Sequence, residues 1–332
     1  MFLGYIHTFR AIAIYFIIAM HCIDVFQWEN NKNLERILRI SISNGTILFV
    51  FIAGYLFQHL SSRFQYKKYL FAKFRNVITP YFFISIPAII VFTLILKRES
   101  VWQGFYDDPV WLQVLNFYLT GLHLAPFWFI PVITIYYLVS PALIQADKSS
   151  VFYYLLPILI LVSCLVGRGG GQPLISFVHF LSVYSLGMFC SRYKMYLNDW
   201  LSKGFVIIIV FIFVILLWLC EYFFAKTTYT YFNFLQKIVL CFFVLGVLVR
   251  YGEKATHHYL NLVADTSFGI FFIHSYVLTA GKMLAHKFFG YLPSGTFQWY
   301  FLTTLITMLV CLGIVYAIKI ILGPKSRMFV GS

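Results

Sequence analysis

Long apolar runs follow one another along the whole chain and are separated by short polar segments. Each run has about 20 residues, enough for an α-helix to cross a hydrocarbon core of about 30 Å. Runs this long and continuous predict membrane-spanning helices and not the strands of a barrel. We expect ten such helices, at about residues 5–27, 41–60, 75–96, 126–146, 151–167, 174–191, 204–224, 231–250, 265–286 and 298–321.

The composition agrees with this pattern. Of the 332 residues, 61% are hydrophobic and 11% are charged, whereas a soluble domain averages about 45–50% apolar and about 25% charged residues. These values predict an all-α, polytopic bundle in the lipid bilayer. We expect one domain over residues 1–332, with no internal repeat and no fused extracytoplasmic domain.

The net charge of +14 is explained by basic loops on one membrane face and does not indicate a nucleic-acid partner. The basic residues concentrate in segments 61–75, 192–203, 250–254 and 319–327. Because basic loops stay in the cytoplasm, we expect both chain ends inside. Segment 97–125 then becomes the largest outer loop, and its stretch WLQVLNFYLTGLHL predicts an interfacial or partly buried helix.

The six cysteines lie inside apolar runs and show no CxxC spacing. They are typical of small buried hydrophobic residues. We therefore expect neither a disulfide framework nor a metal site.

The first run places an arginine and a histidine on one helix face. Arg10 and His21 are eleven residues apart, which corresponds to a rise of about 16 Å and a rotation of about 1100°. Ionisable residues within a membrane are functional hypotheses by default. Two simpler interpretations stay open, namely that Arg10 snorkels to the headgroups and that His21 is a hydrogen-bonded core residue. Asp24 either orients the imidazole of His21 or is solvated at the helix end.

Other runs carry further candidates. Lys73 and Arg75 precede the third run and either anchor the topology or bind phosphate groups. His123 and Trp128 begin the fourth run, where aromatic residues form interfacial belts or sugar platforms. His274 lies in the middle of the ninth run and makes a polar cavity within the membrane more plausible.

Several positions favour structural interpretations. Gly54 permits close helix packing, and Pro80 predicts a kink in the third helix. The tract GRGGG at 167–171 lacks the Lys-Ser/Thr pair of a phosphate-binding loop, so we expect a flexible outer turn. His179 and Lys237 are lone polar residues within runs, and either packing or a cavity position accounts for them.

Four stretches resemble the acyltransferase-3 family of integral membrane acyltransferases, in the expected order and over nearly the whole chain. They are Arg10 to His21 (arginine, ten residues, histidine), Phe49 to Tyr55, Lys73 to Tyr81, and Ser267 to His274. The chain departs from the family pattern where hydroxyls or a glycine are usual, with Ala11, Ala53, Phe268 and Phe271.

The resemblance implies a membrane O-acyltransferase. Such enzymes commonly move an acetyl group from acetyl-CoA, a donor substrate and not a bound cofactor, onto a sugar hydroxyl of a surface polysaccharide or its lipid-linked precursor. A bacterial cytoplasmic (inner) membrane is the implied location. Without a fused esterase-like domain, the chain is expected to act alone or with separate polysaccharide-biosynthesis proteins. A transporter of a polysaccharide or small solute, or a subunit of a polysaccharide synthase, remains the alternative.

The resemblance and the chemistry together assign roles. His21 is the expected base for the sugar hydroxyl, or it carries the acyl group itself. Arg10 is expected to act with it, by contacting coenzyme A phosphates or the thioester. Lys73 and Arg75 are expected to bind the donor. The acceptor is expected to contact His123, Trp128 and His274.

Overall fold

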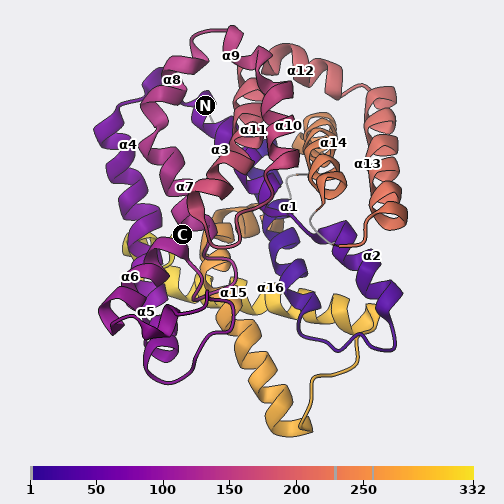
Figure 1. The fold of residues 1–332 in the computed structure, drawn as a ribbon. Coiled ribbons are helices and arrows are strands. Elements are labelled where there is room, and N and C mark those ends of the chain that lie inside the picture. The colour runs from indigo at the N-terminus through magenta and orange to yellow at the C-terminus, as the bar shows by residue number, and fades with distance from the viewer. Residues whose placement is uncertain (1–2, 228–229, 256–257) are drawn as a thin grey trace.

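The computed structural model describes residues 3–227, 230–255 and 258–332, and all regular elements in these ranges are helical (Figure 1). In chain order, the α-helices are α1 (Gly4–Ile23), α2 (Lys32–Ile42), α3 (Thr46–His59), α4 (Tyr66–Lys73), α5 (Thr79–Leu94), α6 (Val110–Thr120), α7 (Phe129–Leu138), α8 (Ser140–Asp147), α9 (Val151–Tyr154), α10 (Leu156–Leu165), α11 (Pro173–Arg192), α12 (Lys194–Leu201), α13 (Gly204–Phe224), α14 (Tyr231–Ala255), α15 (His258–Phe289), α16 (Phe297–Leu322) and α17 (Ser326–Val330).

The expected all-α membrane bundle is confirmed. Within the described ranges, eight helices or continuous helix pairs are long and apolar enough to cross a membrane. A ninth candidate is the pair α7 and α8, which is bent by 60°. Each of the ten predicted runs coincides with helix, but α10 has only ten residues, so the count of ten spans stays a prediction.

Two glycines allow α3 and α11 to pack with their backbones almost in contact. A Cβ atom at Gly54 would lie 2.0 Å from the carbonyl oxygen of Tyr184, and one at Gly187 would lie 2.1 Å from that of Phe51. Only glycine fits at such a distance, as at other membrane helix interfaces with small residues. The packing role expected for Gly54 is therefore confirmed. This pairing fixes α3, whose two ends line separate cavities.

A π-helical segment, Phe74–Ile78, joins α4 to α5. It ends just before Pro80, which lacks an N–H group and whose ring crowds the carbonyl four residues earlier. Widened turns of this kind relieve such a conflict. The structure thus has a π-helical segment shortly before Pro80, and the kink expected there stays a prediction. Lys73 and Arg75 are two residues apart and so point to different sides of the helix.

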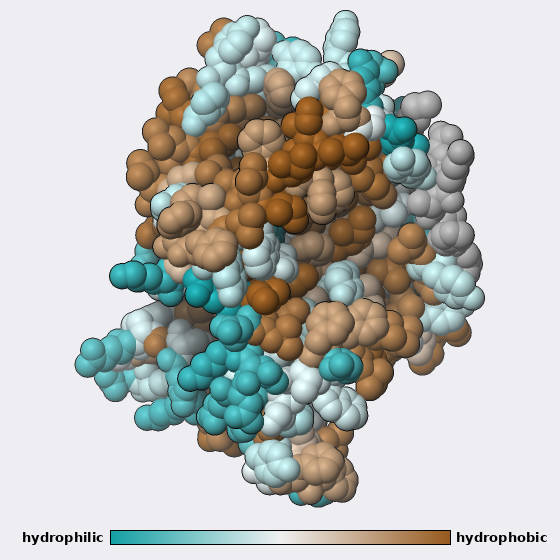
Figure 2. Space-filling view, turned by 90° about the vertical axis from the view of Figure 1, so that its right-hand side faces the viewer, coloured by the Kyte–Doolittle hydropathy of each residue, from teal (hydrophilic) through white to brown (hydrophobic). Residues whose placement is uncertain are grey.

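Apolar side chains cover much of the outer surface. Figure 2 shows the side of the molecule that carries α13, with a broad apolar area above a group of hydrophilic side chains. Phe205, Ile208 and Phe213 on α13 are all exposed. Exposed apolar area on this scale is typical of a lipid-facing surface and not of a soluble protein.

Lys237 and His179 contribute to packing. Lys237 is fully buried, and its Nζ donates to the carbonyls of Ile40 and Ser41, each at 3.0 Å. These carbonyls lie at the end of α2, where a cation is favoured by the helix dipole. Nδ1 of His179 donates to the Ser163 carbonyl at 2.9 Å. The packing interpretation therefore accounts for both residues.

The 97–125 segment contains the expected helix, α6. Its exposed face carries Trp111 and Leu119, whereas Gln113 and Phe117 are buried. The Tyr81 hydroxyl donates to the carbonyl of Tyr118 at 2.9 Å and so ties this segment to α5. Such a one-sided helix suits an interfacial position.

Candidate active site

Two histidines from distant parts of the chain meet inside the bundle. His21 is in the last turn of α1, and His274 is in the middle of α15. Their ring centroids are 5.3 Å apart, and the ring planes are inclined by 37°. α1 packs along α15, which brings the two rings together. The two imidazoles are therefore neighbours, although His274 is not among the residues that line the pocket of His21.

His274 is held in one tautomer. It is fully buried, and its Nδ1 lies 3.1 Å from the carbonyl oxygen of Ile270. Because a carbonyl only accepts, Nδ1 carries the proton and Nε2 presents a lone pair. That Nε2 is buried and has no hydrogen-bond partner in the described ranges. A buried acceptor without a partner is costly, so a proton donor from a substrate fits this position.

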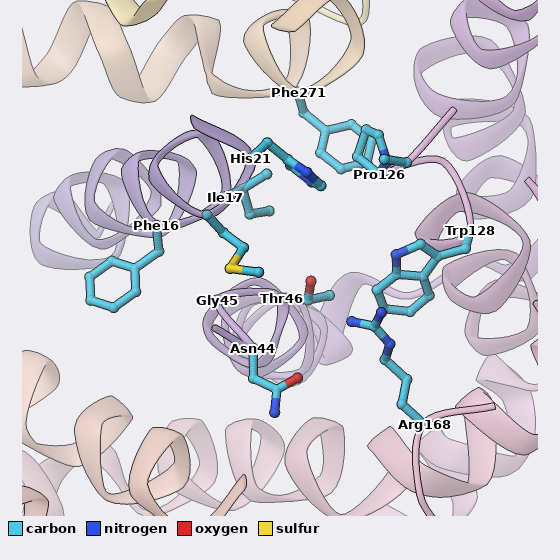
Figure 3. Close-up of a pocket in the computed structure, with 12 residues that line it drawn as sticks. Phe16, Ile17, His21, Asn44, Gly45, Thr46, Pro126, Trp128, Arg168 and Phe271 are labelled. Atoms are coloured by element: carbon cyan, nitrogen blue, oxygen red, sulfur yellow. The ribbon is translucent and has the colours of Figure 1, made fainter. Parts of the chain in front are cut away.

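His21 opens into a small pocket of about 70 Å³. Figure 3 shows His21 and Arg168 pointing into it from opposite sides, with Phe271 beside His21 and Trp128 beside Arg168. The Arg168 guanidinium lies over the indole of Trp128, 4.5 Å from the ring centroid. Phe16 and Asn44 also belong to the lining, but their side chains point away from the centre (Figure 3).

Arg168 was missed as a site residue by reasoning from the sequence. It belongs to the GRGGG tract, which was interpreted as a flexible turn. In the structure this tract brings a cation to the histidine pocket. The available signal was a lone arginine among glycines, since such glycines let the backbone approach a cavity closely.

His123 does not line the histidine pocket in the described structure. It is fully buried, its Nδ1 donates to the carbonyl of Phe117 at 3.1 Å, and its Nε2 accepts from the Ser85 hydroxyl at 2.7 Å. Both ring nitrogens are therefore used. This geometry positions the turn before Trp128, and a contact of His123 with an acceptor stays a prediction.

Asp24 is a helix-end residue. Its carboxylate is 2.8 Å from a guanidinium nitrogen of Arg39, and the residue is exposed. Of the two interpretations of Asp24, the solvated helix end is the correct one. The carboxylate is committed to Arg39 and does not orient His21.

A larger cavity of about 540 Å³ lies at the end of α1 that carries Arg10. Its walls are mostly apolar and aromatic, and they follow α3 from Leu60 to Phe49. Four cations line it: Arg10, Arg63, Lys68 and Lys73. The Lys73 ammonium lies over two rings, those of Tyr69 and Tyr137, at 5.3 and 5.0 Å. We call this the apolar cavity.

A second cavity, of about 760 Å³ and with fewer aromatic side chains in its lining, shares Arg10 with the apolar cavity. It is lined by Arg75, Lys319 and Arg327 together with the exposed carboxylate of Asp265. We call this the basic cavity. Lys73 and Arg75, expected to act together, therefore face different cavities, with Arg10 at the junction. Lys319 and Arg327 were interpreted only as topology charges, since nothing in their spacing indicates a site.

Aromatic residues separate the apolar cavity from the histidine pocket. Phe129 and Phe268 line the first, and Phe271 lines the second. The ring of Phe271 has its centroid 5.8 Å from that of Phe129 and 5.9 Å from that of Phe268. Among the described residues, the two cavities share no lining side chain. Two of the three rings replace tyrosines of the family pattern.

The helical membrane bundle, the histidine pair and the basic-rimmed cavities define an integral membrane protein with a buried polar site. Residues 3–316 match the family model described as an acyltransferase domain, that of the acyltransferase-3 family. The chain belongs to this family and is a membrane acyltransferase. Comparisons with curated proteins and with solved structures gave no match.

Proposed function

We propose that the chain is an O-acyltransferase that moves an acetyl group from acetyl-CoA onto a sugar hydroxyl of a surface polysaccharide or its lipid-linked precursor. The observation that carries this proposal is the order of features along α1. Arg10 lines both the apolar cavity and the basic cavity, and His21 opens into the histidine pocket eleven residues further on. The rise between them is about 16 Å, a distance that an extended pantetheine arm would span with the rings of Phe129, Phe268 and Phe271 turned aside.

The donor would use both cavities. The apolar walls of the apolar cavity suit the pantetheine arm, and Lys73 adds a positive charge to the lining of this cavity. The basic cavity, with Arg75, Lys319 and Arg327, suits the phosphate groups of coenzyme A. Arg10 touches both cavities, so it would hold the diphosphate between them through its planar guanidinium. Of the two roles expected for Arg10, the phosphate contact fits this distance from His21 better.

The size of the histidine pocket supports a short acyl group. A volume of about 70 Å³ holds a few heavy atoms. Phe271 and Trp128 enclose it, together with Ile17 and Met20. An acetyl group and one hydroxyl would fit this space.

The reaction then requires one proton transfer and one acyl transfer. The sugar hydroxyl attacks the thioester carbonyl carbon, the new C–O bond forms and the C–S bond breaks. His21 takes the hydroxyl proton and returns it to the leaving sulfur, so that coenzyme A departs as a thiol. His274, with its lone pair on Nε2, would accept a hydrogen bond from the hydroxyl or from protonated His21. An alternative with acyl-His21 as an intermediate uses the same residues.

The setting follows from the mechanism. Coenzyme A is cytosolic, so Arg10 and the basic cavity would face the cytoplasm of a bacterial inner membrane. The sugar hydroxyl would reach His21 from the other face, alone or delivered by separate polysaccharide-biosynthesis proteins. The coenzyme would come and go with each turnover as a donor substrate.

The test is acyl transfer by the purified protein in lipid nanodiscs. Acetyl-CoA labelled in the acetyl group is supplied with polysaccharide fragments or lipid-linked oligosaccharides, and both free thiol and labelled glycan are measured. We expect equal amounts of coenzyme A and acetylated glycan. Glycan or solute movement across vesicles without coenzyme A release would instead support a transporter and contradict the proposal.

A further inference from the structure

A third cavity, of about 300 Å³, adjoins the histidine pocket. Both spaces are lined by Ala125, Trp128 and Arg168, so they adjoin at these three residues. The third cavity is further lined by Arg98 and Ser100 from the 97–125 segment and by Gly170 and Gly171 from the GRGGG tract. We call it the arginine vestibule. His21 lies in the adjoining histidine pocket, on the other side of Trp128 and Arg168.

The vestibule carries positive charge. Arg98 and Arg168 both line it, and among its described lining residues there is no carboxylate. Nε of Arg98 donates to the Leu122 carbonyl at 2.7 Å, and its guanidinium lies over Phe92 at 5.0 Å. That bond uses one of the five N–H groups of the guanidinium. Burial lowers the pKa of Arg98, as expected for a cation held away from water.

The backbone of the GRGGG tract is shaped to present Arg168. Gly170 and Gly171 have positive φ values of 41° and 100°, which other residues adopt with strain. A Cβ atom at Gly171 would lie 2.9 Å from Leu122, whereas one at Gly170 would meet nothing within 4 Å. Gly170 thus leaves the space around it open, and Gly171 lets the tract approach the 97–125 segment. The tract is a built wall of a cavity and not merely a turn.

We propose that the arginine vestibule binds an anionic acceptor, whose carboxylate or phosphate lies against Arg98 and Arg168 while a neighbouring sugar hydroxyl reaches His21. This inference rests on the proposed function, because it names the class of acceptor. The stack of Arg168 on Trp128 fixes the direction of the guanidinium, and the fork of N–H groups on a guanidinium matches pairs of carboxylate or phosphate oxygens. A glycan carboxylate and the phosphate of a lipid carrier both provide this chemistry.

The experiment measures occupancy and does not depend on turnover. Ser100→Cys is introduced into a chain whose native cysteines are replaced, and the rate of maleimide labelling is measured in nanodiscs. Three matched sugars are added: cellobiose, cellobiouronic acid and cellobiose 1-phosphate. We expect both acids, and not the neutral sugar, to slow labelling. A stronger effect of the uronic acid identifies a glycan carboxylate, and a stronger effect of the phosphate identifies a carrier phosphate.

Two further variants assign the effect to the arginines. Arg168→Gln should raise the half-protecting concentration about 10-fold or more, because a charge-assisted hydrogen bond is lost. Arg168→Lys should retain part of the protection, whereas Lys97→Gln, an exposed cation beside the vestibule, should change nothing. Cysteine at Gln103 in the same segment should show no protection.

Equal protection by cellobiose, or no protection by either acid at its solubility limit, overturns the inference. Coenzyme A release is measured in the same samples. Transfer without acid-selective protection removes the anionic acceptor and leaves the proposed function standing. Acid-selective protection without any transfer from acetyl-CoA supports the vestibule and contradicts the proposed function.

Discussion

The imidazole of His21 lies 5.3 Å, between ring centroids, from that of His274, although the two residues belong to the first and the second-last of the long helices. Nδ1 of His274 is bound to the Ile270 carbonyl, which leaves its Nε2 lone pair without a partner among the described residues. One ring is therefore fixed and buried, and the other opens into the pocket. This division suits a pair in which His21 meets the reacting hydroxyl and His274 stabilises the proton on it.

His21→Gln should reduce acyl transfer about 100-fold or more, because glutamine keeps a polar side chain but does not act as a base near neutral pH. The measurement is coenzyme A release by purified protein at matched amounts. The control is His286→Gln, which changes an exposed histidine near the end of α15 and should leave the rate unchanged. Full activity of the His21 variant with normal folding would return this residue to a packing role.

A substitution at His274 tests whether the lone pair on its Nε2 takes part in acyl transfer. The amide nitrogen of asparagine reproduces the donor at Nδ1 and keeps the bond to the Ile270 carbonyl, whereas the acceptor at Nε2 is lost. His274→Asn should therefore keep the thermal stability of the protein and lower kcat at least tenfold. Melting temperature and kcat are measured together. Wild-type kcat in a stable His274→Asn protein would show that the Nε2 lone pair has no part in transfer.

The fold followed from the sequence because membrane helices are specified by local composition. The ten apolar runs all coincide with helix, and the helical spacing that places Arg10 and His21 on one face agrees with their positions in successive cavities. The π-helical segment next to Pro80 also had a local cause. These features depend on residues near one another in the chain.

The residues that surround His21 could not be predicted from the sequence, because they depend on which helices pack together. Sequence placed His274 in a span without indicating that its ring meets His21. Arg168 was hidden in a glycine tract, and Lys73 and Arg75, two residues apart, line different cavities. His123 and Lys237 looked similar to His21 in sequence, yet main-chain carbonyls and, for His123, the Ser85 hydroxyl account for their polar atoms.

The basic cavity predicts a dependence on the phosphate groups of the donor. Arg327→Gln should raise the KM for acetyl-CoA about 10-fold, since in the proposed donor arrangement it would remove a charge-assisted contact with the ribose 3′-phosphate. The KM for acetyl-dephospho-CoA, which lacks this phosphate, should be the same in the variant and the wild type.

The matched control is Lys325→Gln, a nearby cation outside the lining of this cavity. It should leave both KM values unchanged. An equal rise in KM for both donors in the Arg327 variant would mean that the arginine does not contact the 3′-phosphate. Unchanged values for both donors would remove the basic cavity from donor binding.

Gly54→Ala should destabilise the protein by about 1–3 kcal/mol, the usual cost of overpacking a tight interface. The added methyl group would lie 2.0 Å from the Tyr184 carbonyl oxygen and would force α3 away from α11. Gly313→Ala in α16 is the control, because nothing lies within 4 Å of its added methyl group. Thermal unfolding in detergent should show a lower melting temperature for the first variant only, and equal melting temperatures would contradict the close packing.

The orientation of the bundle decides whether the donor can reach Arg10 from the cytosol. Ser62 lies between α3 and α4 within the basic 61–75 segment, and Gln103 lies in the 97–125 segment that contributes to the arginine vestibule. Both side chains are exposed. The positive-inside rule places Ser62 inside and Gln103 outside.

Single cysteines at these positions, in a protein without its six native cysteines, are treated in intact cells with a membrane-impermeant maleimide. Position 103 should react in intact cells, and position 62 should react only after the cells are permeabilised. The opposite pattern would put Arg10 and the basic cavity on the outer face, where cytosolic acetyl-CoA has no access, and the donor arrangement proposed for this site would be wrong.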